Sequence, residues 1–262
     1  TTQTTPGGCI CDGPSPHYRR PGSNLLFPEF DNQTGAVTLI TVTNVDCTRQ
    51  SGNVDIEYIY IDNTNCQEFN RTETLTPCDT LTLLTNFHNP GMTQGYLYVF
   101  AKDADDISLV FNHLIGNLLI ISGIDVFDYS VNPVAFRGIG SASGVVQPDG
   151  THTDLDDDGI RDLDGTEYDP APDTITIPRF LGQDLGPNGL IKSQLVLIAL
   201  SGGSEFTTFK IDCLLYNDNE KDFSFDHTFY CWDKPFLLDV APASANNFLK
   251  TTMHDDDEII GA

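Results

Sequence analysis

The sequence predicts an all-β protein, an antiparallel β-sandwich or jelly-roll-like fold made of two packed lobes. Short segments rich in β-branched and aromatic residues recur along the chain, and turn residues such as Asn89-Pro90-Gly91 and Asn217-Asp218-Asn219 separate them. No segment repeats its apolar residues every 3.6 positions over three turns, so long helices are not expected. Successive strands without helices between them favour antiparallel pairing over a parallel sheet.

The predicted strands differ in how deeply they should be buried. Residues 54–60 begin with apolar and polar side chains in alternation, which is typical of a half-buried strand. Residues 96–100 and 195–198 are continuous apolar runs, which predict strands buried on both faces. The other predicted strands are residues 37–45, 80–85, 107–111, 118–122, 206–216, 223–232 and 236–240.

Changes in composition suggest five parts of the chain. We expect an extended N-terminal arm (1–24), a first β-lobe (25–148), an acidic calcium-binding linker (149–173), a second β-lobe (174–252) and an acidic C-terminal tail (253–262). The Gly/Ser-rich residues 138–144 are expected to be a flexible connector. A long insertion in a single sandwich is the alternative to two lobes. Both ends have too few apolar residues to form a core, so each is either an arm that orders against a neighbouring subunit or a disordered tail.

An acidic run, Asp-Leu-Asp-Asp-Asp-Gly-Ile-Arg-Asp-Leu-Asp-Gly-Thr-Glu at 154–167, is the strongest chemical signal in the chain. Carboxylates at alternate positions repel one another unless a cation lies among them, and hard cations such as Ca²⁺ take oxygen ligands from acidic loops at positions 1, 3 and 5, with glycine at position 6. The sequence therefore predicts bound Ca²⁺. The candidate metal ligands are Asp154, Asp156, Asp158, Asp162, Asp164 and Glu167.

This run resembles the thrombospondin type 3-like and EF-hand-like calcium loops of extracellular proteins. Position 12, where an EF-hand carries a bidentate Glu, is Gly165, so either Asp164 or Glu167 is expected to complete the ligand shell. The resemblance covers one loop and implies nothing about the rest of the fold. A solvated acidic linker without a bound ion is the alternative.

Charge excludes some classes of partner. The 262 residues include 13 Lys and Arg against 38 Asp and Glu, a formal net charge of −25. Nucleic acids and anionic membrane surfaces are therefore not expected to bind, whereas cations are. Adaptation to a saline environment is a competing explanation for the acidic composition. No apolar run reaches the roughly 18 residues that span a bilayer, so we expect a soluble protein without membrane insertion.

Seven cysteines in a chain that starts at Thr1 predict an exported protein, extracellular or on a cell surface, with most cysteines oxidised. Cys66 with Cys78 is the expected local disulfide, because the loop between them is short. Cys47 could pair with Cys9 or Cys11. A symmetrical hairpin would place Cys213 opposite Asp226, so a bond from Cys213 to Cys231 would require a shifted register. The odd cysteine would be a free thiol or an intermolecular link.

No enzyme motif is present: the chain lacks G-x-S-x-G, H-E-x-x-H and G-x-x-x-x-G-K-[ST], and its six histidines are dispersed. We therefore expect no catalytic residues and no enzymatic activity. His113 and His227 lie in apolar runs and are expected to be hydrogen-bonded core or edge residues. Alternation along residues 223–232 leaves Tyr230 and Trp232 as the candidate binding surface for a glycan.

Three segments, Asn112-His-Leu-Ile-Gly116, Tyr96-Leu-Tyr-Val-Phe100-Ala and Phe229-Tyr-Cys-Trp232-Asp-Lys234, resemble parts of uncharacterised exported bacterial proteins rich in β-structure, and this resemblance implies no activity. Taken together, the sequence predicts a non-enzymatic extracellular structural protein. It would be a calcium-stabilised subunit that binds copies of itself in a fibre, tube, sheath or surface layer. A secreted calcium-dependent adhesive or carbohydrate-binding module is the alternative.

Overall fold

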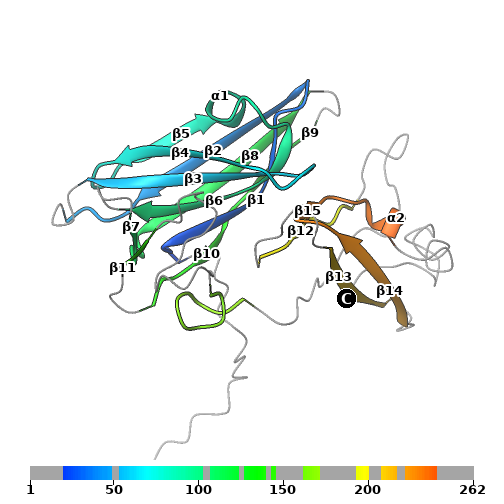
Figure 1. Cartoon of the computed structure of the whole chain (residues 1–262). Helices are drawn as coiled ribbons and strands as arrows, with labels where there is room; N and C mark the ends of the chain where they lie inside the picture. Colours follow the sequence, from blue (N-terminus) through cyan, green and yellow to red (C-terminus); the bar gives the residue numbers. More distant parts are fainter. Residues whose placement is uncertain are drawn as a thin grey trace, which may run out of the picture.

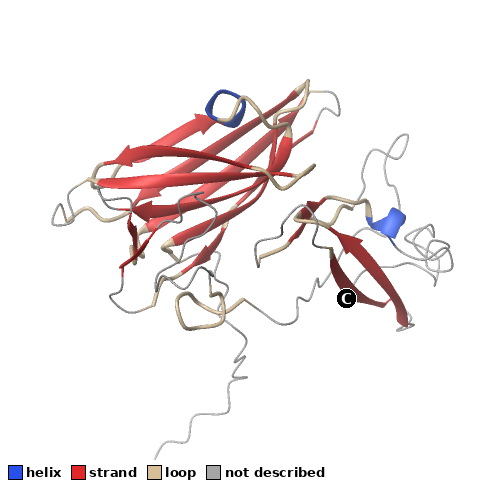
Figure 2. Ribbon diagram, viewed as in Figure 1, coloured by secondary structure: helices blue, strands red, loops and turns tan. Residues whose placement is uncertain are grey.

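The protein is an antiparallel β-sandwich with further strands beside it (Figures 1 and 2). The computed structural model describes residues 20–48, 53–102, 107–123, 127–139, 143–145, 162–171, 193–200, 208–216 and 222–240. The helices in these residues are single turns, α1 (Thr85–His88) and α2 (Leu237–Val240), which confirms the predicted all-β class. No helix in the described ranges is long and apolar enough to span a membrane.

The larger sheet has seven strands, with the order β10-β1-β6-β3-β4 and with β7 and β11 added beside β6. Its strands are β1 (Asn24–Asp31), β3 (Val54–Asp62), β4 (Glu68–Leu75), β6 (Gln94–Lys102), β7 (Ile107–Leu109), β10 (Val134–Phe136) and β11 (Ser143–Val145). The smaller sheet has the order β5-β2-β8-β9. Its strands are β2 (Ala36–Asn44), β5 (Thr80–Leu84), β8 (Leu114–Ser122) and β9 (Phe127–Val131).

The main core lies between these two sheets and follows from the two-residue period of a strand. On β2, Ile40 and Val42 point inward and are fully buried, whereas Thr41 between them lies on the outer side. Leu118 of β8 and Ile56 of β3 meet them in the same apolar cluster. One face of each sheet is thereby removed from water, which is the main stabilising contribution in a sandwich.

The outer face of the larger sheet is buried as well. Tyr98 and Phe100 of β6 and Ile59 of β3 form a second apolar cluster together with Tyr168 and Trp232, which come from far along the chain. The segment 162–171 and the C-terminal strands thus cover this face. The C-terminal strands that cover it are β12 (Leu197–Ile198) and β15 (Trp232–Asp233), whereas β13 (Phe209–Tyr216) and β14 (Asp222–Phe229) pair with each other in a separate two-stranded sheet. The prediction that residues 96–100 form a strand buried on both faces is confirmed.

Strand β1 carries an irregularity that shapes the molecule. Its pairing with β6 shifts between Phe27 and Phe30, so Pro28 and Glu29 form a β-bulge. Gly95 of β6 lies nearby with a φ of +155°, and a Cβ on it would fall 1.8 Å from the Ile61 carbonyl oxygen. Only glycine allows this close approach of the two backbones.

Several predictions require correction. Residues 236–240 are not a strand, because Leu237–Val240 forms the one-turn helix α2; a short apolar run does not distinguish a strand from a helical turn. The expected connector at 138–144 is partly ordered, since Gly138 bridges to Tyr168 and Ser143–Val145 is β11. Strands β1, β4, β9, β10 and β11 were not predicted.

The disulfide pattern also differs from the predicted one. Cys47 bonds to Cys78 and Cys66 bonds to Cys231, with Cα–Cα distances of 4.7 and 5.9 Å. The expected Cys66–Cys78 bridge is wrong, because the two cysteines lie at opposite ends of β4, which pairs with β3 along its whole length. Cys213 carries a free thiol and faces Phe225, one position away from the expected Asp226. The predicted difficulty of a Cys213–Cys231 bond is confirmed.

Candidate functional site

The described half of the acidic run is folded onto the larger sheet. Asp162 donates its backbone N–H to the carboxylate of Glu167 at 2.8 Å, and Thr166 donates its backbone N–H to the carboxylate of Asp164 at 2.8 Å. The backbone N–H of Tyr168 reaches the carbonyl of Asp162 at 3.2 Å. The result is a compact turn that closes at Gly165, whose φ of +101° favours glycine.

This turn is anchored to the sandwich on one side. Ile139 donates its N–H to the carbonyl of Glu167 at 2.7 Å, and Asp169 donates to the carbonyl of Arg137 at 2.9 Å. Glu167 and Tyr168 are 4% and 1% exposed, whereas Asp164 is exposed. Hydrogen bonds from Thr166 lower the pKa of Asp164, so its carboxyl group is ionised at neutral pH and its oxygens can bind a cation.

Only some of the predicted calcium ligands lie within the described residues. Asp162, Asp164 and Glu167 lie within one turn, whereas Asp154, Asp156 and Asp158 lie outside the described residues. In the described ranges, no group of three His, Cys, Asp or Glu side chains is arranged to hold a metal ion. Glu167 already accepts a hydrogen bond inside the turn, so it can also serve to shape the loop.

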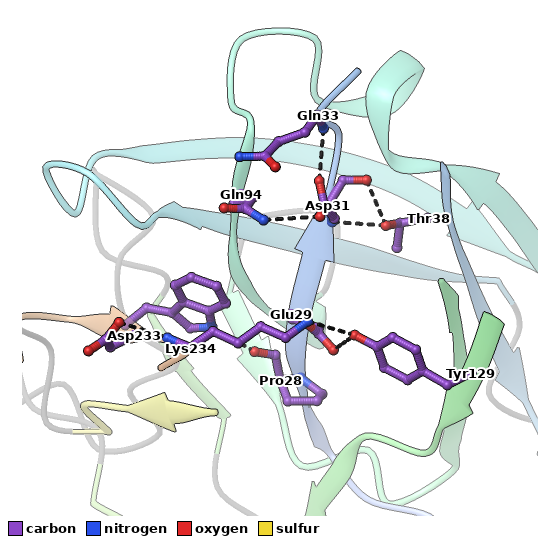
Figure 3. A network of polar contacts seen from close by, with 10 residues as sticks. Pro28, Glu29, Asp31, Gln33, Thr38, Gln94, Tyr129, Asp233 and Lys234 are labelled. Atoms are coloured by element: carbon purple, nitrogen blue, oxygen red, sulfur yellow. Dashed lines mark hydrogen bonds and ion pairs between the residues drawn. The ribbon is translucent and has the colours of Figure 1, made fainter. Parts of the chain in front are cut away.

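A second polar cluster joins the bulge of β1 to the C-terminal strands (Figure 3). Glu29 is 3% exposed; it accepts a hydrogen bond from the Tyr129 hydroxyl and pairs with Lys234, whose Nζ lies 2.5 Å from its Oε2. Nζ of Lys234 also lies 2.9 Å from the Tyr129 hydroxyl oxygen. Beside this cluster, Trp232 donates its indole N–H to the Pro28 carbonyl at 2.9 Å.

This cluster is suited to holding parts together and not to acid–base chemistry. Burial, and next to it the charge of Glu29, raise the pKa of Tyr129 well above its ordinary value, so the phenol keeps its proton. The charges of Glu29 and Lys234 are directed at each other. Each of the three side chains comes from a separate part of the fold, namely β1, β9 and the segment after β15. The cluster therefore fixes the C-terminal strands against the sandwich.

Sequence reasoning did not find Glu29, although a signal was present. Pro28-Glu29 interrupts the apolar run from Leu25 to Phe30, and a proline inside a strand marks a bulge or an edge. The predicted glycan surface is corrected here, because Trp232 is 7% exposed under this cluster and only Tyr230, 53% exposed, faces solvent. His227 is a hydrogen-bonded edge residue, as predicted, with its Nε2 2.7 Å from Asp233.

A third polar group is centred on His88, the last residue of α1, whose ring packs against Tyr58 and Tyr60 of β3. His88 is 6% exposed, and its Nδ1 is 2.9 Å from the Tyr60 hydroxyl, while its Nε2 lies 3.4 Å from Glu73. Burial is the main cause that lowers its pKa below the ordinary 6.5, and the charge of Arg71 acts in the same direction. His88 is therefore neutral at pH 7 and packs against Tyr58 as an edge-on ring.

Comparison with known proteins adds little to this geometry. No protein-family model matches the chain, and no characterised protein matches it in a sequence search. One solved structure is similar, "Crystal Structure of Thermotoga maritima 1070", at 9% identity and a TM-score of 0.35. The match covers 44% of this chain and 95% of that chain. A similarity this low carries no inference about fold or function.

Proposed function

We propose that the protein is a non-enzymatic extracellular structural protein, a calcium-stabilised subunit of a homopolymeric fibre, tube, sheath or surface layer. The observation that carries the proposal is the way in which distant parts are fastened to one sandwich. The acidic segment docks on the larger sheet through Ile139 and Glu167, and the C-terminal strands are held by Cys66–Cys231 and by the Glu29–Lys234 pair. Such bracing suits a subunit that must transmit force without rearranging.

Calcium is part of this proposal. Asp162 and Asp164 would supply carboxylate oxygens from the anchored turn, and Asp154, Asp156 and Asp158 would supply them from the preceding residues. Bound Ca²⁺ would neutralise part of the charge of this loop and fix the loop against the sheet. For an extracellular loop of this kind we expect a dissociation constant of about 10⁻⁴ to 10⁻³ M.

The two disulfides support an oxidising location. Disulfides persist outside the cytosol, and one of these bonds joins residues 165 positions apart, which ties the last described strands to β3 and β4. Extracellular placement on a cell surface, or in a layer around a cell, agrees with both bonds. Copies of the chain are the proposed partners.

The experiment is electron microscopy and sedimentation of the full chain with added calcium and with a chelator. We expect regular polymers with calcium and their loss with the chelator. Asp156→Ala should weaken calcium binding in calorimetry and should impair assembly, whereas Asp212→Ala, a matched change on β13, should do neither. Deleting residues 1–16 or 253–262 should leave a folded protein that does not assemble. A monodisperse protein with abundant calcium that binds a glycan would favour the adhesive or carbohydrate-binding alternative.

A further inference from the structure

The outer face of the smaller sheet is open and almost without charge. Val37, Ile115 and Ile121 on this face are 37%, 40% and 41% exposed, so no described part of the chain covers them as Trp232 covers the other sheet. Val37 pairs with Ile121 across β2 and β8, and Ile115 pairs with Thr43 at the other end of the same two strands. The aliphatic side chains are therefore placed toward both ends of the face.

The middle of the face and its β5 edge are hydroxyl-bearing. Thr41 lies opposite Thr82 and Thr43 lies opposite Thr80, and in each pair the two hydroxyl oxygens are 2.9 Å apart. Each threonine thus satisfies its neighbour, and the pairs present methyl groups and shared hydroxyls instead of unpaired donors. This surface can lose its water at a lower cost than a surface of charged side chains.

The distribution of charge limits which partners can pack against this face. Among its described residues the one ionised side chain is Asp128, which lies opposite Ile121 on the edge strand β9. The whole chain has a net charge of −25, so two copies repel each other through most of their surfaces. Since this face carries only that one carboxyl group, at its edge, it is the place where two copies can come into contact while burying the fewest like charges.

Other occupants fit this face less well. A basic partner would find a single carboxyl group on this face, that of Asp128 on the edge strand, because threonine and aliphatic side chains carry no charge. A glycan is usually held by aromatic side chains, and the described residues of this face include none. A second copy offers the same flat, uncharged surface, and sheets with such faces pack directly on each other.

We propose that the outer face of the sheet β5-β2-β8-β9 is a self-association surface that packs against the same face of a second copy. This inference rests on the proposed homopolymer and names one of its contacts. Four strands about 4.8 Å apart and about seven residues long give a face of about 450 Å². Two such faces together bury about 900 Å², which is below the roughly 1,200 Å² at which specific interfaces begin, so the single contact is weak and is strengthened by repetition in a polymer.

The test is sedimentation of the full chain with a chelator present, so that calcium-dependent polymerisation does not contribute. We expect a concentration-dependent dimer that becomes tighter as sodium chloride rises, because salt screens the repulsion between the two copies. Thr82→Lys should weaken dimerisation by about tenfold or more, since it buries a charge at the contact. Thr228→Lys, the same change at an exposed threonine of β14, should leave dimerisation unchanged.

A second variant protects the test against misfolding. Ile115→Thr keeps a β-branched residue on β8 and removes apolar surface from the open face, so it should weaken the dimer while the unfolding transition is retained. A protein that stays monomeric at every salt concentration would overturn the inference, and so would a dimer that Thr82→Lys and Ile115→Thr leave intact. Polymers that form with calcium in spite of both variants would overturn it and leave the proposed function standing. A dimer that both variants weaken, in a protein that never polymerises, would support the self-association surface and overturn the proposed homopolymer.

Discussion

The two outer faces of the sandwich differ: one is aromatic and covered, and the other is aliphatic and threonine-rich and open, although both sheets share the same core. The outer face of the larger sheet carries Tyr96, Tyr98 and Phe100, which are at most 2% exposed under Trp232 and the segment 162–171. The outer face of the smaller sheet carries threonines and medium-sized aliphatic residues, and it remains open. An aromatic side chain loses too much by exposure to water to lie uncovered in such numbers, whereas threonine does not.

The difference also shows how the chain is organised. The covering C-terminal strands are distant in sequence from the sheet that they cover, and three separate interactions hold them: a disulfide, a partly buried ion pair and an indole hydrogen bond. The open face needs no fastening because it has no cover within the described residues. Mutations that release the cover should therefore affect stability strongly, and mutations on the open face should affect it little.

The largest effect is expected for the double change Cys66→Ser and Cys231→Ser. Loop-closure entropy for 165 residues gives a loss of up to about 5 kcal/mol in the free energy of unfolding, against about 4 kcal/mol for Cys47→Ser with Cys78→Ser, which closes 31 residues. Urea unfolding measures both losses. Hydrogen exchange should show faster exchange in β15 only for the first pair. Equal exchange in both double variants would mean that this bond does not hold the cover.

Trp232→Ala should cost about 3 to 5 kcal/mol, because it leaves a large cavity over the larger sheet and removes the hydrogen bond to Pro28. Phe87→Ala is the matched change on the uncovered part of the molecule, since Phe87 on α1 is 75% exposed. Its cost should stay within about 0.5 kcal/mol. Thermal unfolding of the two variants decides whether the aromatic cover, and not aromatic content in general, stabilises the fold.

These faces could be predicted from the sequence only in part. The continuous run Tyr96-Leu-Tyr-Val-Phe100 correctly indicated burial on both sides, whereas the alternation at the start of residues 54–60 wrongly indicated a half-buried strand, since the neighbouring residues Ile59 and Tyr60 of β3 are both fully buried. The cover could not be predicted, because Trp232 and Tyr168 reach their places through long-range contacts that leave no local period. Strand β4 was missed for a related reason: its sequence, Glu-Phe-Asn-Arg-Thr-Glu-Thr-Leu, is that of a polar edge strand with one weakly apolar side.

The candidate site shows the same limit. The acidic run was visible because its spacing is local, and its second half indeed forms one turn with Asp162, Asp164 and Glu167. The cluster of Glu29, Tyr129 and Lys234 joins residues about 100 positions apart, so no spacing rule could have assembled it. The disulfide pairing failed likewise, because proximity in sequence was used where proximity across strands decides.

Lys234→Met should lower the free energy of unfolding by about 3 kcal/mol, because Glu29 would stay buried without a cation. Adding Glu29→Gln should restore much of the lost free energy of unfolding. Lys210→Met is the control, since Lys210 and Asp226 form an exposed pair on the β13–β14 hairpin, and the loss of an exposed pair should change the free energy of unfolding little. A double-mutant cycle in urea measures the coupling. A cycle without coupling would mean that the interaction between Glu29 and Lys234 does not hold the C-terminal strands against the sandwich.

His88 tests the interior that both faces share. The pKa of His88 in the folded protein lies below 6.5, the ordinary value that it takes in the unfolded chain. At a pH between the folded and the unfolded pKa, the unfolded chain therefore binds more protons than the folded protein. Stability should therefore decrease as the pH falls through 6.5, and it should level off once the folded protein is also protonated. His88→Gln should flatten this part of the pH profile of urea unfolding. An unchanged profile would assign the acid sensitivity to carboxyl groups elsewhere.

The smallest effect is expected on the open face itself. Thr41→Val, Thr82→Val and the double variant should each change the free energy of unfolding by less than about 1 kcal/mol, and the coupling between the two hydroxyls should be about 0.2 to 1 kcal/mol. The reason is that each hydroxyl can bond to water when its partner is removed, which is not true for the buried carboxyl group of Glu29. Urea unfolding of the cycle, at a protein concentration that keeps the chain monomeric, measures this. A cost comparable with that of Trp232→Ala would mean that the threonine pairs hold the sheet together. A small cost would leave association with a second copy as the reason for an uncharged face on so acidic a protein.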